Sequence, residues 1–280
     1  MMVGKKQLAR HAFRFLGRRR SIHLMCRLYE AWYRGDGEYA PERSGELLVL
    51  QHLMPQCSVV FDVGANVGDW TRSALEINSG ATFHLFEPSS DHVQALAESA
   101  FPSNVSINQC ALSDHVGSAV LRKNPSFPSM NTLGAWTRDP KAWVAREEVN
   151  VSTLDEYCHA RDIVSVGYLK LDVEGHELSV LKGADSMLRH GAIRHIQFEF
   201  NSNACYERVF LRDFFEMLRP LQYAFYKITS LGCIRIDDWH HGLEVYSQSN
   251  YLAALDPLPH GLAHGTAVFD STGYSHCVRA

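Results

Sequence analysis

Residues 59–70, VVFDVGANVGDW, contain the pattern that decides the fold. The run Val59 to Val63 is rich in β-branched residues and predicts a buried strand, which a glycine-rich turn connects to a helix beginning near Asp69. Such a turn offers backbone N–H groups and the positive end of a helix dipole to an anionic group. Asp62, at the end of the strand, would instead attract an ammonium or sulfonium group. The stretch therefore predicts a small ligand that carries both charges.

The alternation of apolar and helical segments around this stretch predicts an open α/β sheet. The predicted strands are Val59 to Val63, Thr82 to Phe86, Val105 to Ala111, Tyr168 to Val173 and Ile193 to Phe200, and helices are expected to begin near Asp69, Ser90, Glu177 and Asp185. This order indicates a parallel sheet with helices on both faces. A helix over 209–218 and two further strands, 224–228 and 242–253, are expected to follow, the second of them antiparallel.

The chain divides into three predicted regions. Residues 1–55 are expected to form a helical, basic N-terminal arm, and residues 56–255 the domain that contains the sheet. The predicted helices of the arm cover 8–16, 24–32 and 46–53. Residues 256–280 are rich in Gly, His, Ser and Thr and are expected to be a flexible C-terminal tail.

The composition excludes several classes of function. With 46% hydrophobic and 21% charged residues among 280, the chain is typical of a soluble globular protein, and its net charge of -4 argues against a general affinity for nucleic acid. No apolar run approaches a membrane span and the start lacks the pattern of a signal peptide, so a cytoplasmic location is expected. The seven cysteines are scattered without a C-x-x-C pair, which favours free thiols over disulfides or a zinc site.

Positive charge is concentrated at the start of the chain. The basic residues that precede the first acidic residue, Glu30, are Lys5, Lys6, Arg10, Arg14, Arg18, Arg19, Arg20 and Arg27. Two interpretations stay open, namely an arm that attracts an anionic acceptor or a membrane surface, and a solvated helix face.

Glu87 closes the second predicted strand, roughly twenty residues after the glycine turn. From this position a carboxyl group can accept both hydroxyls of a ribose, although a strand acid that caps a turn is the structural alternative. The spacing suits NAD and S-adenosylmethionine equally. Two details favour S-adenosylmethionine, because the turn has the pattern G-x-x-x-G instead of G-x-G-x-x-G and Asp62 is badly placed for a pyrophosphate. The amino-acid part of this ligand carries both charges that the turn predicts.

Taken together, the strand ends resemble those of the FkbM family of S-adenosylmethionine-dependent methyltransferases. The resemblance covers about residues 57–205 and rests on VFDVGANVGDWT, FEPSS, ALSD, STLDEY, YLKLDVEGHELSVLKGA and IQFEFN, in family order. It implies an α/β, class I methyltransferase (Rossmann-like) mixed sheet of seven strands with a reversed last strand and helices on both faces. It also implies O-methylation, in many members on sugars of glycans or lipopolysaccharide or on natural products.

The resemblance implies a cofactor site at the strand ends. The residues it assigns to that site are Asp62, Gly64, Ala65, Asn66, Gly68, Glu87 and Ser113. Their positions at strand ends add Pro88, Ala111, Leu112 and Asp172. Ala111, Leu112 and Ser113 are expected beside the adenine ring, although an ordinary serine turn explains the same residues.

The segment LKLDVEGHEL supplies candidates for catalysis. A hydroxyl acceptor needs a base or a metal to remove its proton. Lys170, Asp172 and Glu174 alternate along a strand end, and His176 begins the next helix. In related class I O-methyltransferases an acid at the position of Asp172 lies near the methyl group, and His176 titrates near neutral pH. The structural alternatives are a Lys170–Glu174 ion pair and a helix-capping histidine.

A magnesium site is a further hypothesis. Asp172, Glu199 and Asn201 resemble the acid, acid and amide ligands of catechol-type O-methyltransferases, and Mg²⁺ prefers oxygen ligands. The pattern departs from those enzymes because Phe200 separates Glu199 from Asn201. Residues two apart on a strand nevertheless share a face.

The acceptor is expected to bind near residues 122–148, a proline-containing insertion between strands. Phe127, Trp136 and Trp143 could stack on a sugar or ring face, or pack against the sheet. The sequence therefore predicts an O-methyltransferase that acts on a hydroxyl of a saccharide or natural-product ring, a small-molecule or glycan acceptor. The alternatives are an NAD-linked oxidoreductase and a non-catalytic cofactor-binding module.

Overall fold

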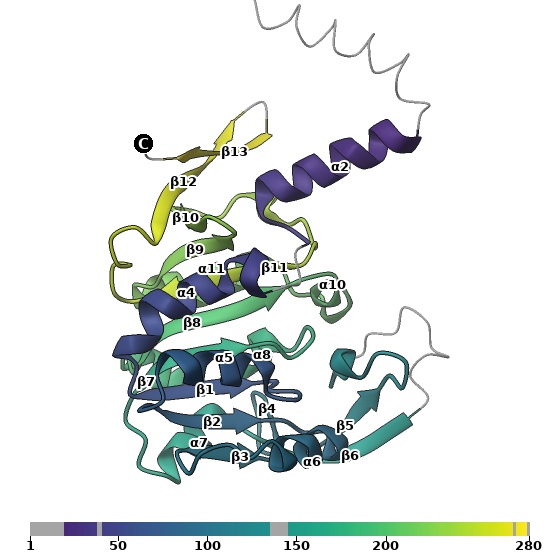
Figure 1. The fold of residues 1–280 in the computed structure, drawn as a ribbon, viewed down its shortest axis with the longest axis vertical. Helices are drawn as coiled ribbons and strands as arrows, with labels where there is room; N and C mark the ends of the chain where they lie inside the picture. Colours follow the sequence, from purple (N-terminus) through teal and green to yellow (C-terminus); the bar gives the residue numbers. More distant parts are fainter. Residues whose placement is uncertain (1–19, 38–40, 135–144, 271–272, 279–280) are drawn as a thin grey trace, which may run out of the picture.

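Strand β1 (Val59–Val63) is an interior strand of the main sheet, and four of its five residues are buried. It pairs in parallel with β2 (Thr82–Phe86) and with β7 (Val166–Leu171). Figure 1 shows this strand in the lower half of one tall, twisted sheet. The computed structural model describes residues 20–37, 41–134, 145–270 and 273–278.

Within these ranges the main sheet has ten strands. From the β3 edge, the order is β3 (Val105–Asn108), β2, β1, β7, β8 (Ile193–Phe200), β11 (Ser249–Ala254) and β9 (Ala224–Thr229). The first five strands are parallel, whereas β11 lies antiparallel between β8 and β9. The structure therefore confirms the predicted mostly parallel sheet with a reversed strand.

Three strands beyond the expected seven extend the sheet past β9. They are β10 (Gly232–Ile236), β12 (Ala263–Asp270) and β13 (Gly273–Val278). β12 and β13 pair antiparallel where the sequence analysis predicted a loose tail. The difference has a physical reason, because β12 takes its backbone partners from β10, about thirty residues earlier, and local composition carries no signal of such a pairing.

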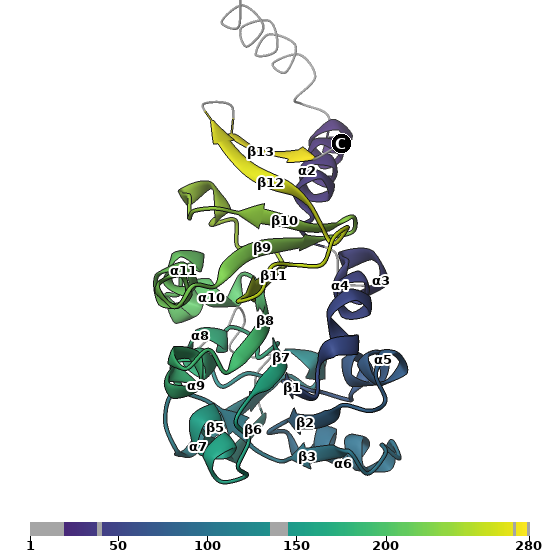
Figure 2. The same cartoon turned by 90° about the vertical axis from the view of Figure 1, so that its left-hand side faces the viewer.

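Helices cover both faces of the sheet, as predicted (Figure 2). One face carries α4 (Glu46–Leu53), α5 (Asp69–Ile77) and α6 (Ser90–Glu98). The other carries α7 (Leu154–His159), α8 (Glu177–Lys182), α9 (Asp185–Arg189), α10 (Asn203–Glu207) and α11 (Leu211–Leu218). Alternate residues of β1 serve the two buried cores, since Val60 packs on the α5 face and Phe61 on the α7 face.

The helix predicted over 46–53 is α4, and it is part of the packed domain. Val49, Leu50 and Leu53 are buried in the same core as Val60. Gln197 of β8 donates a hydrogen bond of 2.6 Å to Glu46. Packing is therefore continuous across the boundary expected at residue 55.

The helix predicted over 24–32 is α2 (Arg20–Arg34), and α3 (Pro41–Ser44) follows it. Figure 1 shows α2 projecting from the upper part of the molecule. The helix predicted over 8–16 and the basic residues before Arg20 lie outside the described residues. No described helix is both long and apolar enough to cross a bilayer.

A second, smaller sheet lies beside the carboxyl ends of the main strands. Its strands are β4 (Ala111–Leu112), β5 (Gly117–Lys123) and β6 (Ala145–Ser152), in the order β4-β6-β5. The single strand predicted over 105–111 was wrong, because Cys110 N–H donates to the Asn108 carbonyl at 2.9 Å and turns the chain between β3 and β4. Phe127 is exposed, and Trp136 and Trp143 lie outside the described residues.

Four 3₁₀ helices complete the described elements: η1 (Met54–Gln56), η2 (Pro128–Met130), η3 (Arg219–Leu221) and η4 (His241–Leu243). Because η4 occupies the start of the strand predicted over 242–253, β11 begins only at Ser249. The six cysteines whose side chains are described are free thiols, as predicted.

The junction of α4 with β9 generates a stability prediction. Gly45 has φ 93°, and a Cβ there would lie 1.9 Å from the Thr229 carbonyl oxygen. Gly45→Ala should therefore destabilise the protein by about 2 kcal/mol or more in urea unfolding. Gly80→Ala is the matched control because a Cβ at Gly80 meets nothing nearer than 3.6 Å. Equal stability of the two variants would contradict the packing of α4 against β9.

Candidate functional site

A cavity of about 760 Å³ lies at the carboxyl ends of β1, β2, β7 and β8. This volume is typical of small-molecule sites. The predicted site residues that line it are Gly64, Asn66, Glu87, Pro88, Ala111, Leu112, Asp172, Glu174, His176, Glu199 and Asn201. The predicted site residues that are not among its lining are Asp62, Ala65, Gly68, Ser113 and Lys170.

Glu87 is held firmly at the cavity wall. One carboxyl oxygen accepts the N–H of Asn66 at 2.9 Å, and the other accepts the N–H of Ser89 at 2.9 Å. His92 Nδ1 lies 3.5 Å from the second oxygen. A carboxyl oxygen has two lone pairs, so the oxygen bonded to Asn66 retains capacity for a further donor. Glu87 is therefore a firmly oriented hydrogen-bond acceptor at the cavity wall.

The glycine turn after β1 serves packing more than anion binding. The N–H groups of Gly64 and Ala65 donate to the Phe86 carbonyl at 2.9 and 3.1 Å, and Gly68 N–H donates to the Ala65 carbonyl at 2.8 Å. A Cβ at Gly64 would lie 1.8 Å from the Asp172 carbonyl oxygen, so only glycine allows β1 and β7 to approach this closely. The N–H groups of Gly64, Ala65 and Gly68 therefore have main-chain acceptors, and their expected contact with an anionic group stays a prediction.

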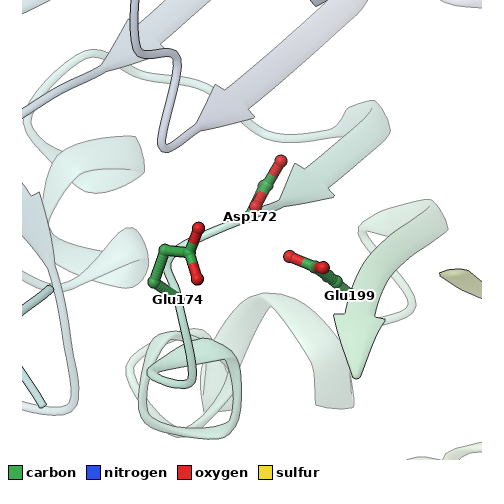
Figure 3. A group of neighbouring side chains, drawn as sticks. All are labelled: Asp172, Glu174 and Glu199. Carbon is green, nitrogen blue, oxygen red and sulfur yellow. The ribbon is translucent and has the colours of Figure 1, made fainter. Parts of the chain in front are cut away.

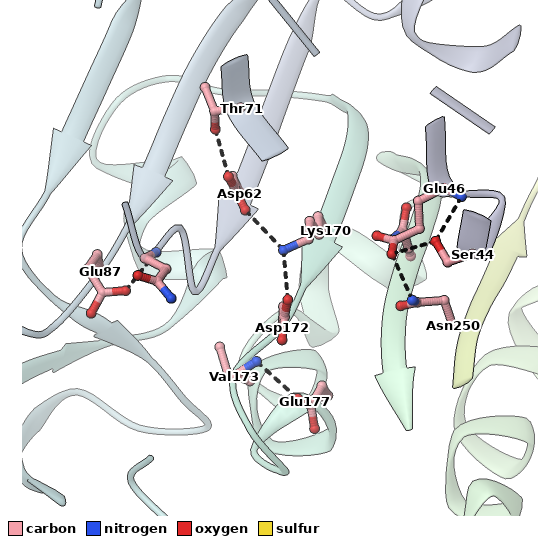
Figure 4. A network of polar contacts seen from close by, with 12 residues as sticks. Ser44, Glu46, Asp62, Thr71, Glu87, Lys170, Asp172, Val173, Glu177 and Asn250 are labelled. Atoms are coloured by element: carbon pink, nitrogen blue, oxygen red, sulfur yellow. Dashed lines mark hydrogen bonds and ion pairs between the residues drawn. The ribbon is translucent and has the colours of Figure 1, made fainter. Parts of the chain in front are cut away.

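Asp62 is directed away from the cavity. Its carboxyl group is fully buried, accepts a hydrogen bond of 2.6 Å from the Thr71 hydroxyl and lies 3.6 Å from Lys170 Nζ (Figure 4). Burial raises the pKa of Asp62, while the Lys170 ammonium and the Thr71 hydroxyl act to lower it. The strand alternation that places Val60 on the α5 face places Asp62 there too. The sequence-based expectation of a direct contact with a cationic ligand therefore finds no support in this geometry.

Lys170 joins Asp62 to Asp172. Its ammonium lies 3.1 Å from a carboxylate oxygen of Asp172, and β1 and β7 align Asp62 directly beside Lys170. Burial alone would lower the pKa of Lys170, but the charges of Asp172 and Asp62 raise it above its ordinary value. Lys170 is thus a fixed positive charge beneath the cavity, and it forms no pair with Glu174.

Asp172 presents a charge to the cavity. Burial acts to raise the pKa of Asp172, but the Lys170 ammonium and hydrogen bonds from Glu199 and Lys170 lower it below the ordinary value. Its side chain is 40% exposed, which distinguishes it from the fully enclosed Asp62. Asp172 is therefore the carboxylate that a cationic ligand group in the cavity would meet.

Three carboxyl groups converge at the ends of β7 and β8 (Figure 3). One oxygen each of Asp172, Glu174 and Glu199 lies within 4.8 Å of the other two. Burial, followed by the charge of Asp172, raises the pKa of Glu174 to about 8 and that of Glu199 well above its ordinary value. Burial and the charge of Asp172 therefore both favour the protonated forms of Glu174 and Glu199.

The cluster contains two of the three predicted metal ligands. Asp172 and Glu199 lie in it together with Glu174, and a hydrogen bond from the Asn201 side chain acts to lower the pKa of Glu174. The side-chain oxygen of Asn201 accepts the N–H of Asn203 at 2.7 Å, which fixes the turn after β8. Asn201 still lines the cavity.

A strained turn after β7 carries Glu174 into the cluster. Glu174 has φ 56° and Gly175 has φ 98°, both in the left-handed region that L side chains rarely adopt. Glu177 stabilises this turn, because one of its carboxyl oxygens accepts the N–H groups of Val173 and Gly175 at 3.0 and 3.2 Å. Burial raises the pKa of Glu177 to about 7.

His176 lines the cavity and binds Ser113. Its Nε2 atom lies 2.9 Å from Ser113 Oγ, and Ser113 also donates to Asp114 at 3.2 Å. Burial lowers the pKa of His176, so the imidazole is neutral near pH 7. Its side chain does not cap α8. The pairing identifies Ser113 as a support for His176 rather than a wall of the cavity.

Several residues at the cavity were not predicted from the sequence. Thr132 from the loop after β5 donates to the Glu174 carbonyl at 3.0 Å, and Asn203 donates to the Glu174 carboxyl group at 2.6 Å. Tyr246 and Gln248 come from the loop before β11, and Arg27 comes from α2. These loops are far apart in the chain, and only the insertion at 122–148 gave a sequence signal.

The strand order and the cavity at the carboxyl ends define a class I methyltransferase type of α/β fold. The family model of the methyltransferase FkbM domain matches residues 62–228, more than half of the chain. The protein belongs to the FkbM methyltransferase family.

Named relatives agree with this assignment. The 31-O-demethyl-FK506 methyltransferase FkbM of Streptomyces tacrolimicus is 29% identical in an alignment of 157 residues that covers 45% of this chain and 59% of that protein. The hexuronic acid methyltransferase AglP of Haloferax volcanii is 27% identical in an alignment of 154 residues that covers 52% of this chain and 59% of that protein. The chain thus matches about three fifths of the length of each relative. A crystal structure of methyltransferase FkbM from Methylobacillus flagellatus KT aligns with a TM-score of 0.42 at 17% identity, over 70% of this chain and 43% of that one.

The raised pKa of Glu177 generates a prediction about stability. Its ordinary value is 4.5 and its value in the fold is about 7, so its protonated form stabilises the fold at low pH and this contribution is lost as pH rises from 4.5 to 7. Glu177→Gln keeps the accepting oxygen without the charge. The variant should gain on the order of 1–3 kcal/mol relative to the wild type between about pH 5 and about pH 8 in urea unfolding. A difference between the two proteins that does not vary with pH would exclude a buried, protonated Glu177.

Proposed function

We propose that this protein transfers a methyl group from S-adenosylmethionine to a hydroxyl group of a saccharide or natural-product ring. The observation that carries the proposal is Glu87, a carboxyl group oriented by two backbone N–H groups at the wall of the cavity. Support for O-methylation and for such an acceptor comes from the two named relatives. One is a 31-O-demethyl-FK506 methyltransferase, and the other is a hexuronic acid methyltransferase.

The cavity residues fit the methyl donor in a modified arrangement. Glu87 would accept the two ribose hydroxyls, and Ala111 and Leu112 supply an apolar surface for the adenine ring. Asp172, ionised and facing the cavity, would bind the ammonium group in place of Asp62. When bound, S-adenosylmethionine supplies an electrophilic methyl group together with its leaving group.

Glu174 is the residue best placed to receive the acceptor proton. Its carboxyl group lies beside Asp172 in the cavity, and a pKa of about 8 keeps it close to the operating range of a general base. The hydrogen bond of 2.6 Å from Asn203 holds its orientation. His176 is the second candidate because it is neutral and lines the cavity, but its Nε2 atom is already bonded to Ser113.

A divalent metal is a second candidate for activating the hydroxyl. Asp172, Glu174 and Glu199 offer the oxygen ligands that Mg²⁺ prefers, and the predicted ligand Asn201 also lines this cavity. Ionised Glu174 and Glu199 would be needed, so binding must release protons. Calorimetry with magnesium chloride alone, in buffers of different ionisation enthalpy, should show this proton release if the metal binds. An absence of heat and of proton release would eliminate the metal.

A binding experiment tests the methyl donor directly. The wild type should bind S-adenosylhomocysteine in a calorimeter and should not bind NAD. Glu87→Gln should weaken this binding by about 10- to 100-fold, because a charged hydrogen-bond acceptor is lost. Glu98→Gln is the matched control, since Glu98 is exposed on α6 outside the cavity. Preference for NAD would favour the oxidoreductase alternative, and an unchanged affinity of Glu87→Gln would remove Glu87 from the ribose site.

A further inference from the structure

Helix α2 has four large apolar side chains that are more than half exposed. Leu24, Met25, Leu28 and Tyr29 are 55%, 68%, 60% and 65% exposed. At about 100° per residue these four side chains fall within an arc of about 140° on the helix. Large apolar side chains gathered on one face of a projecting helix mark an interaction surface. We call these four residues the α2 apolar face.

The opposite side of α2 is polar and mainly basic. Arg27, Arg34 and His23 fall there together with the acidic Glu30, and Arg34 pairs with Glu30 and donates to the Gly242 carbonyl. The helix therefore separates an apolar face from a basic face along its length. This pattern is typical of helices that lie in the plane of a bilayer surface, with the apolar face among the acyl chains and the polar face directed away from them.

The positive charge of the surrounding sequence indicates which kind of partner covers the α2 apolar face. The first 27 residues contain eight lysines and arginines and no acidic residue. A second copy of the chain would bring two such positive segments together, which is unfavourable. An anionic lipid surface would instead attract each basic residue near it. We propose that α2 docks this protein on anionic membrane surfaces through the α2 apolar face.

The position of α2 gives this docking a consequence at the cavity. Arg27 of α2 lines the cavity together with Tyr246 and Gln248, so the helix lies at the cavity rim. The N–H of Gly37, just after α2, donates to the Gln248 carbonyl at 2.7 Å and fixes this relation. Docking of α2 would bring the rim close to the bilayer. If the proposed function holds, the acceptor hydroxyl would then belong to a glycan or ring presented at a membrane surface.

Flotation of the full chain with lipid vesicles tests the docking. The wild type should float with phosphatidylcholine vesicles containing about one third phosphatidylglycerol, and binding should weaken at least about tenfold with pure phosphatidylcholine or in high salt. The triple variant Leu24→Ser, Met25→Ser, Leu28→Ser should lose about tenfold or more in affinity for the anionic vesicles. The matched control is Val164→Ser with Val116→Ser, which removes apolar side chains that are 83% and 64% exposed elsewhere. The control should bind like the wild type.

Three outcomes would overturn the proposal. The first is no flotation of the wild type with anionic vesicles, and the second is equal flotation of the triple variant. The third is a wild type that light scattering shows to be a dimer while the triple variant is a monomer, because a second copy would then cover the α2 apolar face. Flotation is measured without S-adenosylhomocysteine. Its failure therefore leaves the proposed function intact, whereas loss of S-adenosylhomocysteine binding leaves the docking intact.

Discussion

The site depends on the buried ammonium of Lys170, which lies between the carboxyl groups of Asp62 and Asp172. A charged group without water is stable only beside opposite charge, and this lysine has two carboxyl partners as well as the face of Trp70 at 5.6 Å. One partner, Asp62, is enclosed in the sheet, while the other, Asp172, reaches the cavity. As a result, the carboxyl ends of β1 and β7 present one negative charge to the cavity, that of Asp172.

The other acidic groups follow from that charge. Glu174 and Glu199 lie so close to Asp172 that ionising all three would place like charges together in a poorly hydrated space. Burial and this repulsion raise the pKa values of Glu174 and Glu199. Two carboxyl groups that favour the protonated form therefore lie beside the ionised Asp172. Only the ionised form of Glu174 can accept a proton from a hydroxyl, and a pKa of about 8 makes that form more basic than an ordinary carboxylate. The strained turn at Glu174, supported by Glu177 and Asn203, is the local structure that makes this arrangement possible.

Much of the fold followed from local patterns. The bounds of β1, β2, β8 and α4 agree with the sequence predictions, because each has a periodic apolar pattern and clear ends. Glu87 was predicted at the site because it closes the second predicted strand, roughly twenty residues after the glycine turn, and it lines the cavity. The edge strands β12 and β13 were missed because their pairing depends on β10.

The electrostatics of the site could not be predicted in the same way. Asp62 was expected to meet a cationic ligand, but its partner Lys170 is more than a hundred residues away, and only the register of β1 with β7 brings them together. The role of Asn203 depends likewise on a turn after β8 that carries no motif. Sequence therefore predicted which residues are at the site, and tertiary contacts decided which of them face the cavity.

The central claim is that Lys170 keeps Asp172 ionised while its two acidic neighbours hold protons. Carbon-13 NMR titration of the labelled aspartate and glutamate carboxyl groups, assigned with single Asn and Gln variants, tests it most directly. Asp172 should stay ionised below the range usual for aspartate, Glu174 should titrate near 8, and Glu199 should remain protonated beyond its usual range. Titration of all three groups near 4, as in exposed carboxyl groups, would contradict the account.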